Sequence, residues 1–190
     1  EQVESAVIQD SDVVYIEGYL LSSEAGVEAA LKAQQEAHGA GAKVALTLSD
    51  GFIIDVFRDP LEAVMKGGVD LLFSNESEAK AYADRDSVST ACSVLGKVVG
   101  DYVVTLGGEG AIVSDQGNVR EVKGNAVDVV DTNGAGDAFA GAFLFGMTNG
   151  YTNEQAAKLA NYAGAQVVSK LGARLDRGLA GEIEGILGEG

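Results

Sequence analysis

Short apolar runs alternate with amphipathic stretches along this chain, and this alternation constrains its fold most strongly. Apolar runs of four or five residues, separated by helical stretches, are typical of βα units whose buried strands form one parallel sheet. We therefore predict an α/β fold with three layers, a mainly parallel sheet and helices on both of its faces. The runs expected to form such strands are residues 13–16, 44–48, 69–73 and 102–106.

Cap residues predict where several helices begin and end. Ser22 or Ser23 caps a helix that ends at Gly39. Thr152 and Gln155 stand three residues apart and form a capping box, which opens a long helix that ends near residue 170. Further helices are expected at residues 61–66, after a loop that holds Pro60, from residue 76 onwards, at 88–95 and, weakly, at 178–190.

Other patterns place individual segments. The helix that contains Cys92 has apolar side chains at positions i, i+3, i+4 and i+7, which puts this cysteine in the core. Residues 111–114 and 119–122 are predicted to form a hairpin, the antiparallel part of the sheet. Residues 138–147 are apolar all round, as in a helix buried between two layers. Because no repeat or linker interrupts the chain, residues 1–190 are predicted to form one domain.

The charge balance and the cysteine content exclude several classes of function. Lys and Arg number 13 against 29 Asp and Glu, a net charge of −16, so unassisted binding to nucleic acid or to an anionic membrane is not expected. One Cys and one His exclude a disulfide framework and a Cys/His zinc site. Without signal-peptide features or an apolar run of membrane-spanning length, the chain is expected to be a soluble, cytoplasmic protein.

A glycine-rich turn at residues 131–137 comes directly before the apolar helix. Such a turn directs unpaired backbone N–H groups and the positive end of the helix dipole at one point, where anions bind. Phosphate is the expected occupant, because Gly134 and Gly136 allow close approach of the backbone. Asp137 follows in the first helical turn, so this segment combines a candidate base with a candidate anion hole.

The same residues have a simpler interpretation. Gly134 and Gly136 then only shape a turn, and Asp137 is an acidic residue that complements the helix dipole. Two other phosphate-binding motifs are excluded, because the chain contains neither GxxxxGK[ST] nor GxGxxG.

The segment DTNGAGDAFAGAFL at residues 131–144 closely resembles the signature of the ribokinase-like (PfkB) carbohydrate and nucleoside kinases. Segments that match this family in the same order are LLFSNESEA at 71–79, TLGGEG at 105–110, ANYA at 160–163 and KLGA at 170–173. The resemblance implies a ribokinase-like fold and an ATP-dependent phosphotransferase. Such an enzyme moves the γ-phosphoryl group to a primary hydroxyl of a sugar or nucleoside, with Mg²⁺ as cofactor.

The resemblance also implies roles for particular residues. Asp137 is the expected catalytic base, and the N–H groups of Gly134, Ala135 and Gly136 form the anion hole. The residues expected against the nucleotide are Thr105, Gly107, Gly110 and Asn161. Those expected to help place Mg²⁺ are Asn75 and Glu78, and those that support a monovalent-cation (K⁺) site in some members are Asp131 and Thr132, with residues 170–172.

Three of these assignments have structural alternatives. Asn75 and Glu78 have the spacing of a helix-capping pair. Gly107 and Gly110 suit a plain turn between a strand and a hairpin. Asn161 can be an ordinary polar residue of a helix.

Family members usually carry a further N-terminal portion with most of the acceptor contacts and a lid. We therefore read this chain as the C-terminal, nucleotide-binding and catalytic portion of a longer protein, truncated at the N-terminus, whose full-length parent can be a homodimer. Residues 46–53 and 71–79 look more like adenosine kinases and their sugar-kinase relatives than like fructokinases. The alternatives are a ribokinase- or fructokinase-type sugar kinase, a nucleotide-binding fragment without turnover, and a vitamin or hydroxymethylpyrimidine kinase.

Overall fold

The structure is a computed structural model that describes residues 3–188. The chain divides into two compact units, residues 1–104 and 105–190, and each is described by itself. The prediction of a single domain stays a prediction. Within the described residues no helix is long and apolar enough to cross a membrane.

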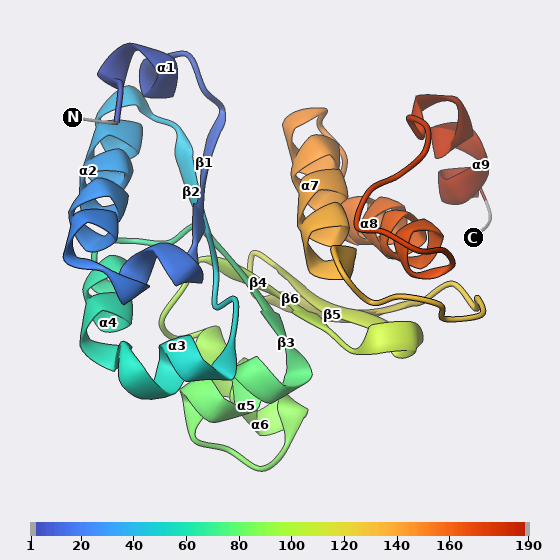
Figure 1. Ribbon diagram of the computed structural model, residues 1–190, viewed down its shortest axis with the longest axis horizontal. Helices are drawn as coiled ribbons and strands as arrows, with labels where there is room; N and C mark the ends of the chain where they lie inside the picture. The colour runs from blue at the N-terminus through green and yellow to red at the C-terminus, as the bar shows by residue number, and fades with distance from the viewer. Residues whose placement is uncertain (1–2, 189–190) are drawn as a thin grey trace. The chain divides into compact units, whose positions relative to one another are not determined.

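The first unit is built on strands that lie in the order β1-β2-β3-β4 (Figure 1). β1 and β2 are parallel, with Val14 opposite Val44, and β2 and β3 are parallel, with Ala45 opposite Leu71. Residues 44–46 of β2 are fully buried, as expected for a strand covered on both faces. The predicted α/β fold is confirmed. The strands are β1 (Val13–Glu17), β2 (Lys43–Thr47), β3 (Leu71–Asn75) and β4 (Asp101–Thr105).

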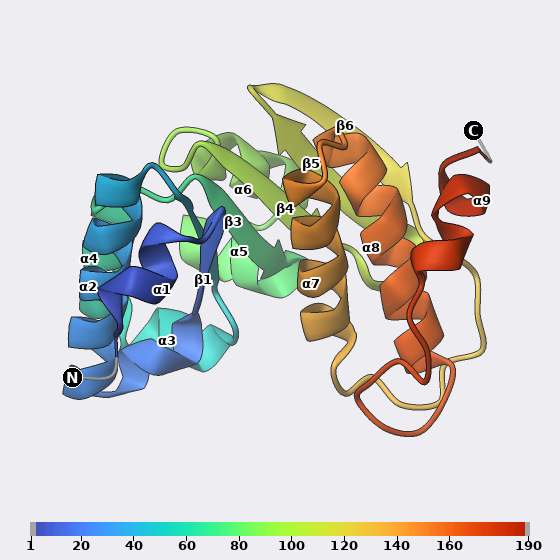
Figure 2. The same ribbon diagram turned by 90° about the horizontal axis from the view of Figure 1, so that it is seen from above.

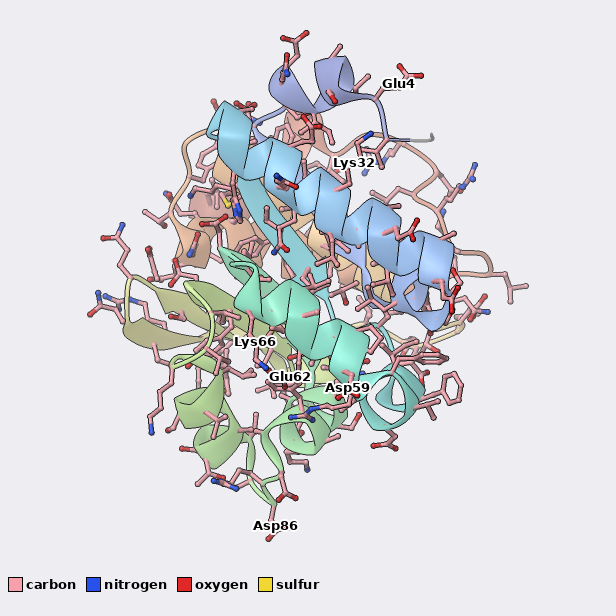
Figure 3. All side chains as sticks on the ribbon, turned by 90° about the vertical axis from the view of Figure 1, so that its left-hand side faces the viewer. Glu4, Lys32, Asp59, Glu62, Lys66 and Asp86 are labelled. Carbon is pink, nitrogen blue, oxygen red and sulfur yellow. The ribbon has the colours of Figure 1, made fainter. Side chains whose placement is uncertain are left out.

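Helices connect these strands. α2 packs against β1 and β2, and Figure 3 shows α4 beside it. Cys92 of α6 is buried as predicted, and burial raises the pKa of its thiol. The helical segments of this unit are α1 (Ser5–Gln9), η1 (Gly18–Ser22), α2 (Glu24–Ala40), α3 (Gly51–Val56), α4 (Arg58–Lys66), α5 (Glu76–Ala83) and α6 (Val88–Leu95).

Two helix boundaries in the first unit differ from the sequence prediction, and one helix was missed. α2 runs to Ala40 and is closed by Gly41 and not by Gly39, because Gly41 adopts the left-handed conformation (φ 79°) that ends a helix. Pro60 lies in the first turn of α4, where its missing N–H costs no hydrogen bond, and not in a loop. α3 was not predicted; Asp50 caps it by accepting a hydrogen bond from the Phe52 N–H at 2.7 Å.

The second unit consists of the predicted hairpin and helices packed on it. β5 and β6 are antiparallel, with Ile112 opposite Glu121. α8 packs against both strands, and α7 lies beside α8 (Figure 2). Thr152 and Gln155 form the predicted capping box. The elements are η2 (Gly107–Glu109), β5 (Gly110–Asp115), β6 (Asn118–Lys123), α7 (Ala135–Thr148), α8 (Asn153–Val168), η3 (Ala180–Glu182) and α9 (Ile183–Gly188).

The expectation that the helix over residues 138–147 is buried all round is wrong for this unit. Phe139 and Phe143 point into the core, but Phe145 is 45% exposed and Gly141 is also exposed. An all-apolar sequence does not show whether every face of a helix is buried, or whether one of its apolar faces is left exposed. The last two residues of the tail predicted at 178–190 lie outside the described residues.

Candidate functional site

The glycine turn that opens α7 is shaped by one residue that must lack a side chain. Gly134 is the N-cap of α7 and has a φ of 75°, in the left-handed region. A Cβ at this position would lie 2.5 Å from the Ala173 carbonyl oxygen. Both the conformation and the close approach therefore require glycine here. Residues 170–173, singled out in the sequence, lie against the turn.

The N-terminus of α7 presents backbone donors, although not all of the predicted ones are free. The Ala135 N–H already donates to the Thr132 carbonyl at 3.3 Å. The N–H groups of Gly136 and Asp137 belong to the first helical turn, where a helix supplies no acceptor. The Asp137 side chain is exposed in that turn, at the positive end of the helix dipole.

Asp131 ties this turn to the segment after α8. Its Oδ1 accepts a hydrogen bond from the Asn133 N–H at 3.0 Å, and its Oδ2 accepts one from the Gly172 N–H at 3.1 Å. The two N–H donors, of which Asn133 has the larger effect, hold the pKa of Asp131 below its ordinary value of 3.8. Asp131 is therefore an ionised anchor of the loop.

A cavity of about 410 Å³ in the second unit is lined by all four residues predicted to contact the nucleotide. It contains Thr105, Gly107, Gly110, Asn161, Ala135 and Gly136, together with Thr132. No Asp, Glu, Lys or Arg lines it among the described residues. Its remaining polar and apolar walls include Asn125, Val127, Val129, Phe139, Ala165 and Val168. Such a cavity suits a flat apolar ring at one end and backbone donors at the other.

Gly110 holds one wall of this cavity in place. It has a φ of 114°, and a Cβ there would lie 2.0 Å from the Val122 carbonyl oxygen. Its own carbonyl accepts a hydrogen bond from the Leu106 N–H at 2.8 Å. The glycines of the 107–110 loop thus serve both a tight turn and the cavity wall.

Asn161 lines the cavity and also makes structural hydrogen bonds, while its predicted contact with a nucleotide stays a prediction. It is 7% exposed, lines the cavity, and its Nδ2 donates to the carbonyls of Val122 at 3.2 Å and Lys123 at 3.0 Å. Its amide therefore anchors the end of β6 to α8.

Asn75 and Glu78 lie in the first unit and form a complete capping box on α5. The Glu78 carboxylate accepts from the Asn75 N–H at 3.0 Å and from the Asn75 Nδ2 at 2.6 Å, and the Asn75 Oδ1 accepts from the Glu78 N–H at 2.8 Å. Glu78 is 8% exposed, and burial raises the pKa of its carboxyl. The structural alternative for this pair is confirmed, and its metal role stays a prediction.

The same geometry decides how Mg²⁺ fits this pair. Each carboxylate oxygen of Glu78 accepts one hydrogen bond from Asn75, which leaves lone pairs for a water but ties the side chain to the cap. Because Mg²⁺ keeps several of its waters in proteins, the pair fits a hydrated ion held through water and not one that replaces the cap.

One residue near this pair was missed in the sequence. The negative charge of Asp50 contributes to the raised pKa of Glu78. Asp50 lies three residues after the end of β2 and Asn75 is the last residue of β3, and neighbouring parallel strands end at the same sheet edge. The sequence signal that could have found Asp50 is a polar residue close to the end of each of two successive strands.

Comparison with known proteins shows which family this chain resembles over most of its length. The family model described as pfkB family carbohydrate kinase matches residues 1–177. The adenosine kinase of Schizosaccharomyces pombe is 28% identical over 183 residues, covering 88% of this chain and 53% of that protein.

Two solved structures extend the comparison. The adenosine kinase of Sinorhizobium meliloti is 35% identical, with a TM-score of 0.91, over 96% of this chain and 57% of that one. A protein from Escherichia coli solved in complex with ATP and Mg²⁺ is 25% identical, with a TM-score of 0.85, over 99% of this chain and 62% of that one. The chain thus spans about half the length of the curated relatives it matches.

Proposed function

Because the chain belongs to the pfkB family of carbohydrate kinases, we propose that it moves the γ-phosphoryl group of ATP to a primary hydroxyl of a nucleoside or sugar. One observation carries the proposal. A cavity with no charged lining side chain among the described residues is walled by two glycine turns, and one of these turns opens the helix that carries Asp137. This arrangement suits a base and sugar in the cavity and phosphates at the N-terminus of α7.

The chemistry assigned to this chain's own residues follows from their positions. Phosphoryl transfer passes through a loose transition state with charge spread over the equatorial oxygens, so positioning and electrostatic stabilisation dominate. The N–H groups of Gly134 and Gly136 stabilise that charge, while the Ala135 N–H must leave the Thr132 carbonyl to contribute. Asp137 accepts the proton of the acceptor hydroxyl.

Mg²⁺ neutralises the phosphate oxygens when it is bound, and the proposal assigns Asn75 and Glu78 to its hydration shell. No cationic side chain of the described residues lines the cavity, so the nucleotide should bind as its Mg²⁺ complex. The proposal extends to a K⁺ site at Asp131 and Thr132, although both Asp131 carboxylate oxygens already accept backbone hydrogen bonds.

An adenosine-kinase-like acceptor is the leading choice, supported by the similar proteins from S. pombe and S. meliloti. Ribokinase-type transfer to a free sugar is the second. The cytoplasmic location and a homodimer of the whole protein are part of the same proposal. A nucleotide-binding chain without turnover is the competing function, because the chain spans about half of its relatives.

Calorimetry and NMR of the folded chain test the nucleotide site. We expect Mg·ADP to bind saturably and to shift the amide signals of Gly107, Gly110 and Gly136. ADP with EDTA should bind at least about tenfold more weakly, since no side-chain cation replaces the ion. A folded sample that gives neither heat nor shifts would contradict the proposal.

A further inference from the structure

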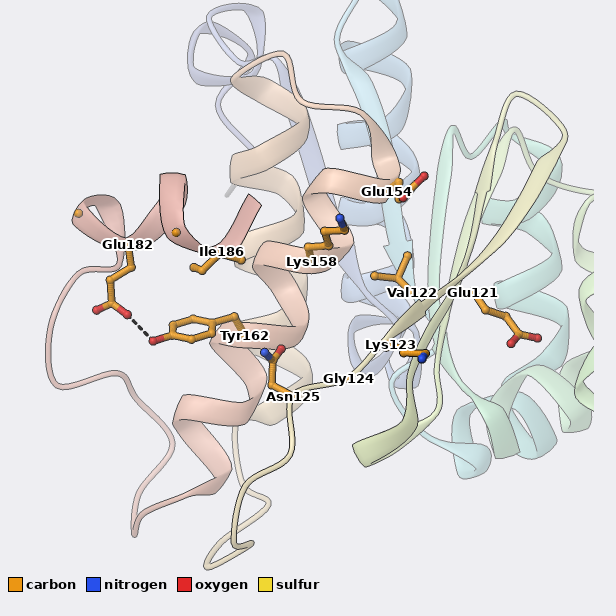
Figure 4. Close-up of a pocket in the computed structure, with 12 residues that line it drawn as sticks. Glu121, Val122, Lys123, Gly124, Asn125, Glu154, Lys158, Tyr162, Glu182 and Ile186 are labelled. Atoms are coloured by element: carbon orange, nitrogen blue, oxygen red, sulfur yellow. Dashed lines mark hydrogen bonds between the residues drawn. The ribbon is translucent and has the colours of Figure 1, made fainter. Parts of the chain in front are cut away.

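A second cavity of about 620 Å³ lies in the second unit, and no part of the proposed reaction uses it. Figure 4 shows its walls: the end of β6, the outward side of α8 and the C-terminal segment that contains α9. We call it the outer cavity. The side chains that line it include Lys123, Asn125, Lys158, Tyr162, Glu182 and Ile186.

The carboxylates of the outer cavity are largely neutralised. Glu154 pairs with Arg120 at 3.4 Å. Glu182 pairs with Arg177 at 2.6 Å and accepts a hydrogen bond from the Tyr162 hydroxyl, which fastens the C-terminal segment to α8 (Figure 4). The remaining carboxylate, Glu121, extends from β6 away from Tyr162.

The lysines of the outer cavity are not neutralised. The side-chain ammonium group of neither Lys123 nor Lys158 has an ion pair or hydrogen bond among the described residues. Lys158 is only half-exposed, on the face of α8 one turn before Tyr162. Although the chain has a net charge of −16, this one cavity has two uncompensated ammonium groups on its walls. Unpaired cations in a concave site favour an anionic ligand.

We infer that the outer cavity binds a small organic phosphate, a monoester with an apolar or aromatic body. Lys123 and Lys158 hold the phosphate as charge-assisted donors, and the Asn125 amide adds a neutral donor. The Tyr162 ring and the Ile186 side chain contact the apolar body of the ligand.

This site shares a wall with the proposed nucleotide cavity. Gly124 and Asn125 line both, and the Gly124 N–H donates to the Glu109 carbonyl at 3.0 Å, within the 107–110 loop. A ligand in the outer cavity therefore contacts a segment that also positions the glycine loop. Any change that it makes in Mg·ADP affinity must be matched by an equal change in its own affinity when Mg·ADP is bound. Only this coupling rests on the proposed function.

The test uses phenyl phosphate as the probe, titrated into the ¹⁵N-labelled chain with and without saturating Mg·ADP. We expect saturable shifts at Gly124, Gly181 and Gly185 in both titrations. Lys158→Met keeps the apolar stem and removes the charge, so it should weaken binding about tenfold. Lys97→Met, which removes an exposed lysine outside the cavity, should have no effect.

Several results separate this inference from the function proposed above. Shifts confined to Gly134 and Gly136 that vanish with Mg·ADP would mean that the probe fills the anion hole, and would overturn the outer site. Equal affinities for Lys158→Met and Lys97→Met would overturn it too. Lys123→Met provides a second variant if Lys158→Met does not fold. Failure to bind Mg·ADP would contradict the nucleotide site but not the outer one.

Discussion

The Asp131 carboxylate accepts a hydrogen bond from the Gly172 N–H across 41 positions of sequence, at 3.1 Å. This contact joins the turn that opens α7 to the segment that follows α8. The turn is further locked by the close approach of Gly134 to the Ala173 carbonyl. Residues 172 and 173, which come later in the chain, thus contact the turn that forms the candidate anion hole.

Replacement of Asp131 should weaken the contact between the turn that opens α7 and the segment after α8. Asp131→Asn keeps one acceptor and loses the charge, so the Gly172 amide should exchange with deuterium about tenfold faster. Asp128→Asn is the matched control, an exposed carboxylate of the same loop. Unchanged exchange at Gly172 would show that the contact does not hold the loop.

The same contact predicts a dependence on pH. Because backbone donors lower the pKa of folded Asp131 below 3.8, its contribution is fully present above that pH and is lost as the pH falls through the lower, folded value. Exchange protection of Gly172, corrected for intrinsic rates, should therefore survive to below pH 3.8. Loss of protection well above that pH would contradict an ionised anchor.

The contribution of Glu78 to stability should depend on pH in the opposite direction to that of Asp131. Burial raises the pKa of Glu78 above 4.5, so the folded state holds the proton more tightly, and the stabilisation is lost as the pH rises through the folded pKa. The free energy of unfolding of the wild type, relative to Glu78→Gln, should therefore fall as the pH rises from 4.5 towards neutrality. Denaturant titrations measure it, with exposed Glu76→Gln as the control. A constant difference would be inconsistent with the burial argument.

The glycine turn predicts a loss of nucleotide binding without loss of fold. Gly134→Val forces a branched side chain against the Ala173 carbonyl in a left-handed conformation, so the turn must move. Mg·ADP affinity should fall at least about tenfold. Gly141→Ala in the same helix, where a Cβ meets nothing within 4 Å, should bind normally. Calorimetry with circular dichroism separates binding from folding, and equal affinities would refute the role of the turn.

Helix starts and amphipathic helices could be predicted from the sequence because they depend on residues that are close together in the chain. The capping boxes at Asn75 and Thr152 and the period of the helix at 88–95 depend on residues three or four apart. The segment DTNGAGD predicts the turn and the helix that follows it. Their positions agree with the structure within a few residues.

Features that depend on distant residues could not be predicted. The exposed face of Phe145 depends on what packs against α7, and the two anchors of Asp131 depend on where residues 170–173 return. Asn161 shows the same limit, because its bonds to the end of β6 span 38 and 39 positions. The role of Asp137 is predicted from its place in the first turn after the glycine turn and from the family resemblance, and it needs a direct experiment.

The most direct measurement is the rate at which the folded chain converts adenosine to its 5′-phosphate with Mg·ATP, compared between wild type and Asp137→Asn. We predict product from the wild type and a kcat at least about a hundredfold lower for Asp137→Asn, with Mg·ADP affinity nearly unchanged. Ribose in place of adenosine tests the second acceptor class. Equal kcat values would contradict the assignment of Asp137 as base, and a wild type that binds Mg·ADP but phosphorylates neither acceptor would contradict phosphoryl transfer by this chain.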